Sequence, residues 1–194
     1  MKLVYGVGVN DADYVVKPTV NGKQTICPAY RAWVDMLQRC YSAKFQLKNP
    51  SYLNTTICKE WKSFMAFRAW WLNHQVDSWQ LDKDVLGIGG GNLYSPDTCI
   101  YIPSWINSFI IDNGAGRGEW PIGVCYDKQT GKYKAQCRHP FGNQEYLGLF
   151  SNPTDAYGAW LNRKLEIAVE LKSQMDEIDF RIYQRVVEII SNAK

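Results

Sequence analysis

The amino-acid sequence predicts an α+β protein, on three observations. Apolar residues in residues 28–42 (PAYRAWVDMLQRCYS) recur at three- and four-residue steps, the spacing of an amphipathic helix. Residues 121–150 contain three short apolar runs separated by turn residues, the pattern of a three-stranded antiparallel sheet. Residues 154–194 return to helical spacing. The expected architecture is an amino-terminal module of helices and short strands, then the sheet packed on a helix, with a long helical carboxy-terminal tail.

The amino-terminal module begins with an irregular or short-stranded stretch, residues 1–27, that turns at Asn21-Gly22. A first helix over 28–42 and a second over about 59–73 follow, each with an apolar face. WQLDKDVL then reads as a short strand, GIGGGNLYSPD as its loop, CIYIP as a second strand and SWINSFI as a helix. The predicted order in this stretch is therefore strand, loop, strand, helix.

The glycine-rich segment DNGAGRGEWP marks a boundary between modules. We predict an amino-terminal module over 1–112, a linker over 113–120, a sheet domain over 121–172 and a helical tail over 173–194. The tail is one long helix or two helices broken near Ser173–Asp176. Its apolar spacing of about 3.5 residues fits packing on the body of the protein, and equally a seam between two chains of a homodimer.

Composition narrows the class of protein. A hydrophobic content of 46% and a charged content of 21% are those of a globular chain. No apolar run approaches the roughly 20 residues of a membrane span, and no signal peptide is visible, so we expect a cytoplasmic protein without a membrane partner. Six cysteines without a C-x-x-C pair and only two histidines give no zinc pattern. The net charge of +3 is compatible with nucleic acid without requiring it.

The segment KYKAQCR carries the sharpest local signal. Side chains of a strand alternate between its faces, so Tyr133, Ala135 and Cys137 share one face, where small residues allow a helix to pack closely. The other face carries basic and amide side chains, which could contact base edges and phosphates in a DNA groove. In the simpler interpretation it is an ordinary solvent-exposed face of a strand. The residues of that second face are Lys132, Lys134, Gln136 and Arg138.

The loop in LDKDVLGIGGGNLYSPDTC is not a phosphate-binding loop. A P-loop requires G-K-[ST] after its glycines, and this sequence has GGGN instead. The dinucleotide pattern G-x-G-x-x-G also fails, because Asn92 follows the glycines and no helix begins there. The glycines instead connect the two predicted strands.

Residues 121–172 resemble the Apetala or ethylene-response-factor type of DNA-binding domain found in phage homing endonucleases. The resemblance rests on PIGVCYDKQTGKYKAQCR, on EYLGLF and on a helix that opens TDAY. It implies that the sheet binds double-stranded DNA. The residues expected to contact DNA are Lys132, Lys134, Gln136 and Arg138, and Arg117 of the linker would follow the minor groove or remain solvated.

Residues 28–109 resemble phage proteins of the HNH endonuclease class. The shared motifs are WVDMLQRCY, CKEWKSFMAFRAW, LDKD, GNLYSPDTC and Ile106-Asn107. The resemblance implies a β-β-helix unit that holds one divalent cation, Mg²⁺ or Mn²⁺ if the protein cleaves DNA. Mapped residue by residue, Asp82 stands where the family has its metal-binding aspartate, Lys83 stands where it has the general-base histidine, and Asp84 follows. Asn92 and Asn107 would supply the remaining oxygen ligands.

Lys83 departs from the family pattern at the position of the general base. A lysine with its usual pKa of about 10.4 is a poor base at neutral pH, and two flanking aspartates favour its charged form. Three interpretations follow: a nuclease fold that has lost its chemistry, a slow or nicking enzyme that uses Asp82 or Asp84 with a metal-bound water, or a structural loop braced by Asp84 and Asn92. The two resemblances thus imply a phage-type protein that binds double-stranded DNA in an infected bacterial cell and derives from an HNH homing endonuclease with a degenerate nuclease site. An active nicking endonuclease and a protein that binds a host factor through its tail are the alternatives.

Overall fold

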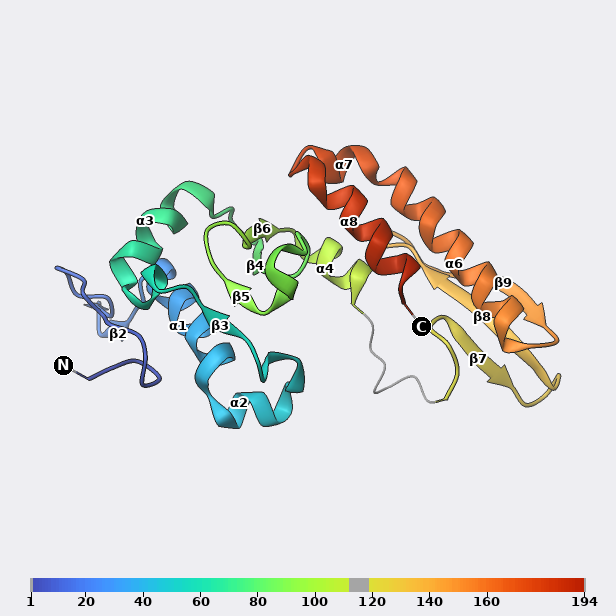
Figure 1. Cartoon of the computed structure of the whole chain (residues 1–194), viewed down its shortest axis with the longest axis horizontal. Coiled ribbons are helices and arrows are strands. Elements are labelled where there is room, and N and C mark those ends of the chain that lie inside the picture. Colours follow the sequence, from blue (N-terminus) through green and yellow to red (C-terminus); the bar gives the residue numbers. More distant parts are fainter. Residues whose placement is uncertain (1, 112–118, 194) are drawn as a thin grey trace. The chain divides into compact units, whose positions relative to one another are not determined.

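The computed structural model describes residues 2–111 and 119–193 and has the predicted α+β class (Figure 1). The chain divides into two compact units, Met1–Tyr101 and Ile102–Lys194. This division precedes helix α4 (Ser104–Ile110), whereas the sequence placed the boundary after residue 112, because α4 packs on the carboxy-terminal helix of the second unit. In the described part of the chain, no helix has both the length and the apolarity needed to cross a membrane.

The first unit combines helices with three small two-stranded sheets, which pair β1 with β2, β3 with β5 and β4 with β6. The β3–β5 pair is parallel and the β1–β2 pair antiparallel. In chain order the elements are β1 (Thr19–Val20), β2 (Lys23–Gln24), α1 (Pro28–Tyr41), α2 (Ala43–Lys48), η1 (Pro50–Tyr52), β3 (Thr56–Ile57), η2 (Glu60–Lys62), α3 (Phe64–His74), β4 (Gln80–Asp82), η3 (Ile88–Gly91), β5 (Leu93–Tyr94) and β6 (Ile100–Ile102).

The core of the first unit forms around the apolar stripe of α1, as its spacing predicted. Trp33 is fully buried and its indole Nε1 donates a hydrogen bond to the backbone oxygen of Trp61 at 2.7 Å. The second helix starts later than the predicted residue 59. Ser63 has extended backbone angles and its side chain accepts from the Ala66 amide, so α3 begins at Phe64 after a short 3-10 turn.

The second unit contains the predicted three-stranded sheet, with strand order β7-β8-β9 and antiparallel pairing throughout. Helix α6 lies along this sheet (Figure 1). In chain order the elements are α4 (Ser104–Ile110), β7 (Val124–Asp127), β8 (Lys132–Arg138), β9 (Gln144–Phe150), α6 (Pro153–Glu170), α7 (Lys172–Asp176) and α8 (Phe180–Ser191).

Small side chains bring the sheet and α6 together. Ala135 on β8 and Ala156 on α6 are fully buried in one cluster, and Cys137 is 1% exposed. This packing confirms the helix-facing side predicted from the alternation of KYKAQCR. A bidentate ion pair adds a polar clamp, because Arg163 of α6 donates to the Glu145 carboxylate of β9 at 2.6 and 3.1 Å. The sheet is therefore fixed on its helix through one face.

Of the two alternatives predicted for the carboxy-terminal tail, the structure has the broken one, and the tail folds back as a helical hairpin. The break follows α7, and Asp179 caps α8 by accepting a hydrogen bond from the Arg181 amide. The apolar stripe is buried within the second unit, against α4 and α6, and is not left open as a seam for a second chain. The buried members of that stripe are Ile167, Ala168, Leu171, Met175, Ile182, Val186 and Ile190.

Candidate functional site

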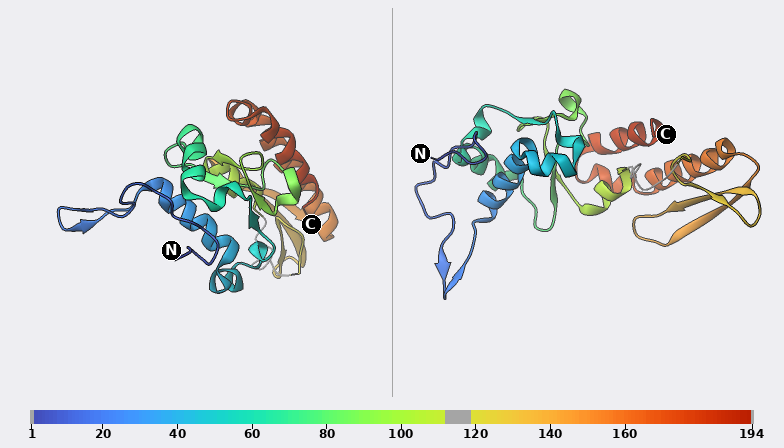
Figure 2. Two further views of the ribbon diagram at one scale, coloured as in Figure 1. Left: turned by 60° about the vertical axis from the view of Figure 1, so that its left-hand side comes forward. Right: turned by 90° about the horizontal axis from the view of Figure 1, so that it is seen from below.

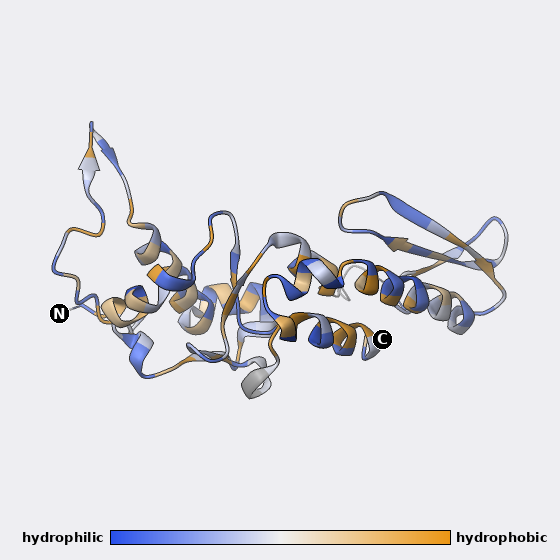
Figure 3. Ribbon diagram, turned by 90° about the horizontal axis from the view of Figure 1, so that it is seen from above, coloured by the Kyte–Doolittle hydropathy of each residue, from blue (hydrophilic) through white to orange (hydrophobic). Residues whose placement is uncertain are grey.

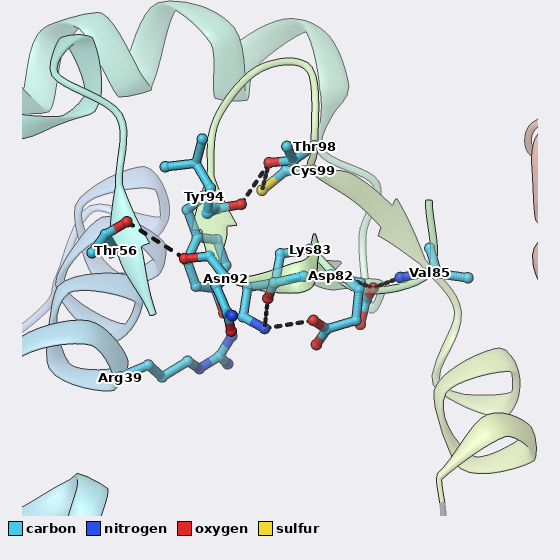
Figure 4. A network of polar contacts seen from close by, with 12 residues as sticks. Arg39, Thr56, Asp82, Lys83, Val85, Asn92, Tyr94, Thr98 and Cys99 are labelled. Carbon is cyan, nitrogen blue, oxygen red and sulfur yellow. Dashed lines mark hydrogen bonds and ion pairs between the residues drawn. The ribbon is translucent and has the colours of Figure 1, made fainter. Parts of the chain in front are cut away.

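Asp82 ends strand β4 and caps the turn that follows it. The side chain is 7% exposed, and its Oδ1 accepts hydrogen bonds from the amides of Asp84 at 2.8 Å and Val85 at 2.7 Å (Figure 4). Burial raises the pKa of Asp82, and the two amide bonds partly oppose that rise. The geometry gives this carboxylate a structural role at the start of the glycine loop.

Lys83 is a buried cation held by the loop. Its side chain is 5% exposed, and its Nζ donates to Asp84 Oδ1 and to the backbone oxygen of Gly91, each at 2.6 Å (Figure 4). The ammonium also lies 5.4 Å from the ring centroid of Tyr52 and 5.8 Å from that of Tyr94. The Lys83 ammonium is thus held by two oxygen acceptors and faces two aromatic rings, and an ammonium has no lone pair with which to accept a proton.

Gly91 is the position in the glycine run where a side chain is excluded. Its φ is +74°, which favours glycine, and a Cβ there would lie 2.9 Å from Asp84 Oδ1. The backbone of Gly91 thereby approaches Asp84 closely enough for Lys83 to bond to both. This close approach to the lysine–aspartate pair explains the glycine at position 91, whereas a Cβ at Gly90 would meet nothing within 4 Å.

The predicted oxygen donors Asn92 and Asn107 lie in different units and have different surroundings. Asn92 acts through its main chain, since its backbone oxygen accepts from the Thr56 amide at 2.8 Å and so fixes the β3–β5 pairing, while the residue is exposed. Asp82 and Asn92 belong to the first unit, whereas Asn107 lies on α4 of the second. The proposed brace of Asp84 and Asn92 is thus replaced by a brace of Asp84 and Lys83.

The residues of this loop do not fit the divalent cation that the HNH resemblance implies. One oxygen of Asp82 is committed to two amides, and one oxygen of Asp84 to the Lys83 ammonium. A positive charge fixed at this point opposes binding of Mg²⁺ or Mn²⁺ nearby. Across residues 2–111 and 119–193, no three His, Cys, Asp or Glu side chains group in a way that could hold a metal ion.

Substitution of Asp82 tests its capping role. Asp82→Ala leaves two turn amides without their acceptor and should lower the free energy of unfolding by about 1–3 kcal/mol. Asp82→Asn keeps an oxygen in place and should lose less. Guanidinium unfolding followed by tryptophan fluorescence measures both, and equal loss in the two variants would contradict the capping role.

The same variants carry a pH signature. A carboxyl whose pKa is raised in the folded state binds its proton more readily there than in the unfolded chain, so its contribution to stability grows as the pH falls. The wild type should therefore gain stability relative to Asp82→Asn as the pH is lowered to about 4.

The second candidate site is the face of the three-stranded sheet opposite α6. Directly paired residues of an antiparallel sheet share a face, so the register places residues of β7 and β9 beside those of β8. Along β8 this face carries Lys132, Lys134, Gln136 and Arg138, here called the basic row, with Lys132 and Arg138 exposed and the other two half-buried. The predicted alternation of side chains along this strand is confirmed.

Strand β9 adds two residues to this face that the sequence reasoning did not assign. Tyr146 pairs with Gln136 and is 60% exposed, and Gln144 pairs with Arg138. The register shifts between Ala135 and Gln136, the sign of a β-bulge. The bulge breaks the two-residue alternation of β9. Without that break, alternation along β9 could have assigned Tyr146 to the open face from the sequence alone.

The cations of the basic row differ in their ion pairing from cations on the helices of the same unit. Within residues 2–111 and 119–193, Lys132, Lys134 and Arg138 have no carboxylate partner within ion-pair distance, whereas Arg163 and Arg185 each do. One acidic residue, Asp127, is directly paired with the row, opposite Lys132. Arg117, the remaining predicted contact, lies outside the described residues.

The chain was compared with known proteins by sequence family and by structure. No protein-family model, no curated protein and no solved structure matches it.

Proposed function

We propose that this protein binds double-stranded DNA through the open face of its three-stranded sheet. The observation that carries the proposal is the basic row, which holds three cations and an amide without carboxylate partners among the described residues. Unpaired lysines and arginines on one face release counterions when they meet phosphates, which provides sequence-independent affinity. The resemblance of residues 121–172 to the Apetala type of domain supports the same proposal.

Within the basic row the side chains would divide the work of recognition. Arginine and glutamine form bidentate hydrogen bonds with guanine and adenine edges, whereas lysine meets phosphates as a point charge. Gln136 stands between Lys134 and Arg138, with Tyr146 directly beside it on β9. The Arg163–Glu145 clamp and the close contact with α6 would hold the sheet rigid while it is bound.

The proposal includes a nuclease ancestry without nuclease chemistry. The β4–loop–β6–α4 order follows the pattern by which the amino-terminal half resembles HNH proteins, but the general-base position holds a buried ammonium bonded to Asp84 and Gly91. We favour a degenerate site in which Lys83 replaces a catalytic group by a structural one. An active nicking enzyme would require Asp82 or Asp84 to exchange its present partners for a metal.

A titration and a cleavage assay test both parts of the proposal together. Fluorescence anisotropy with a labelled duplex should show binding whose affinity falls steeply as salt rises, and supercoiled plasmid should stay intact with Mg²⁺ or Mn²⁺. Absence of binding at low salt would refute DNA binding. Nicking that disappears in Asp82→Asn would restore the enzyme alternative.

Gln136 offers a test of base recognition separate from affinity. Gln136→Ala removes a group that reads base edges without changing the charge, so binding to random-sequence duplex should change less than about twofold. Selection of preferred sites from a random duplex library should instead yield a weaker consensus, by about 1–3 kcal/mol at one position. An unchanged consensus would assign Gln136 to the solvated part of the strand.

The alternative of a host-factor-binding protein rests on the carboxy-terminal helices. Most of the tail's apolar stripe is buried inside the second unit, which leaves less surface for such a partner than the sequence suggested. Duplex binding by the intact chain would favour the DNA proposal over this alternative.

A further inference from the structure

The hairpin β1–β2 is an element that the basic row does not involve. Thr19 pairs with Gln24 and Val20 with Lys23, so Asn21 and Gly22 form a two-residue turn. Both turn residues have positive φ, 50° and 73°, which is the type I′ geometry that suits the twist of a β-ribbon. The predicted turn at Asn21-Gly22 is thus the tip of a regular two-stranded ribbon.

Among the described residues, the ribbon is anchored at its base. Val16 is buried in the core of the first unit, and the Cys27 amide donates to the Val16 oxygen at 2.9 Å. From Thr19 to Thr25 every residue is exposed, and the ribbon projects away from the helices of its unit (Figures 2 and 3). We call residues 17–26 the hairpin arm.

Such an arm does little for the fold. A lone two-stranded hairpin is marginally stable in water, and this one buries no strand residue of its own. Its closure relies on few backbone bonds, one of which runs from the Thr25 amide to the Pro18 oxygen at 2.8 Å. An exposed, polar ribbon of regular geometry is better explained by something that it contacts than by packing.

The chemistry of the hairpin arm indicates an anionic, hydrogen-bonding partner. No acidic residue occurs between Asp13 and Asp35, a stretch that contains Lys17, Lys23 and Arg31. The arm adds the amides of Asn21 and Gln24 and the exposed methyl groups of Val20, which is 52% exposed. Amides read base edges, lysines meet phosphates and apolar groups contact the thymine methyl.

We infer that the hairpin arm is a second DNA-contacting element, which enters the major groove of duplex DNA. The major groove, about 12 Å wide, admits a two-stranded β-ribbon. Charge favours DNA over a protein strand added to the ribbon edge, since the arm carries two cations and no carboxylate. This inference rests on the proposed function and extends it, because it adds a contact from the first unit to that of the sheet.

Removal of the arm's charge tests the inference in the intact chain. Lys17→Ala combined with Lys23→Ala should weaken duplex binding about tenfold or more at about 150 mM salt and lower the salt slope by about two. The matched control, Lys44→Ala with Lys48→Ala, removes the same charge from exposed positions on α2 and should have a smaller effect. All four lysines are exposed, and the Lys17 Nζ lies 5.9 Å from the centroid of the Tyr30 ring, so a circular-dichroism melt should show both variants folded.

A second measurement does not depend on affinity. Hydrogen exchange at the Lys23 and Thr25 amides should slow when duplex is added to the wild-type protein, because bound DNA would hold the ribbon closed. Unchanged exchange at these amides in the presence of saturating duplex would overturn the inference.

The outcomes separate this inference from the proposal on which it rests. If the arm variant binds like the wild type, or the control loses as much, the arm inference is overturned while DNA binding stands. If the wild type binds no duplex, both fail. A concentration-dependent increase in sedimentation of free wild type that the arm variant lacks would assign the ribbon to a second copy of the chain instead.

Discussion

The triple variant Lys132→Ala, Lys134→Ala and Arg138→Ala should lose duplex affinity by about a hundredfold at about 150 mM salt. Each cation that meets a phosphate adds about 0.9 to the salt slope, so the loss of Lys132 and Lys134 should lower the slope by nearly two, and the loss of Arg138 removes a base contact in addition. The row's side chains point away from the buried face that holds Ala135 and Cys137, so the sheet should remain folded on α6. Anisotropy titrations at several salt concentrations measure both quantities.

A matched triple variant separates the face from the total charge. Lys172→Ala, Arg181→Ala and Arg185→Ala remove three cations from α7 and α8, where each pairs with a carboxylate of its own helix region. The three basic side chains are 36–48% exposed, so their removal should cost little stability and the control should fold. An equal loss of affinity in both triples would mean that net charge, not the sheet face, determines binding, and would refute the assignment of the basic row.

Replacement of Lys83 should have the largest effect on stability among the predicted site residues. Lys83→Ala removes a buried ammonium that makes two hydrogen bonds and lies over two tyrosine rings, and should lower the free energy of unfolding by about 3 kcal/mol. Lys83→Met keeps the apolar stem and should lose less. Chemical unfolding followed by tryptophan fluorescence reports the loss, with Lys59→Ala as an exposed control in the same unit.

This experiment also distinguishes a structural lysine from a catalytic one. A structural Lys83 predicts a destabilised protein whose DNA affinity at low temperature is close to that of the wild type. A catalytic Lys83 predicts unchanged stability together with loss of a measurable nicking activity. The second pattern would require the Lys83 Nζ to exchange its contact with Asp84, 2.6 Å away, for a contact with substrate.

The sequence predicted the buried face correctly in segments that have one regular spacing of apolar residues, either helical or alternating. The stripe of α1 and the alternation of β8 predicted which side chains are buried, since both segments pack through a single face. The parallel pairing of β3 with β5 was not predictable, because it joins Thr56 to Leu93 through two-residue strands with no alternation to read. The start of helix α8 was also not predictable from the sequence. Asp179 caps this helix within a stretch whose apolar spacing is continuous.

The candidate sites show the same limit. The sequence named Asp82, Lys83 and Asp84 but could not say which atoms they bond, and the family pattern suggested a metal where the structure has a lysine bonded to Asp84 and Gly91. The basic row was found because strand alternation is a strong rule. Tyr146 was missed because a bulge changes that rule within one residue.

The ammonium of Lys83 has a consequence for the conditions under which the first unit keeps its shape. Loops that recruit a divalent ion to hold carboxylates and carbonyls together come apart when a chelator removes it. Here the cation is covalently part of the chain, so it cannot be extracted and does not compete with other proteins for a scarce ion. The glycine loop should therefore be as well ordered in a metal-starved cell as in a metal-rich one.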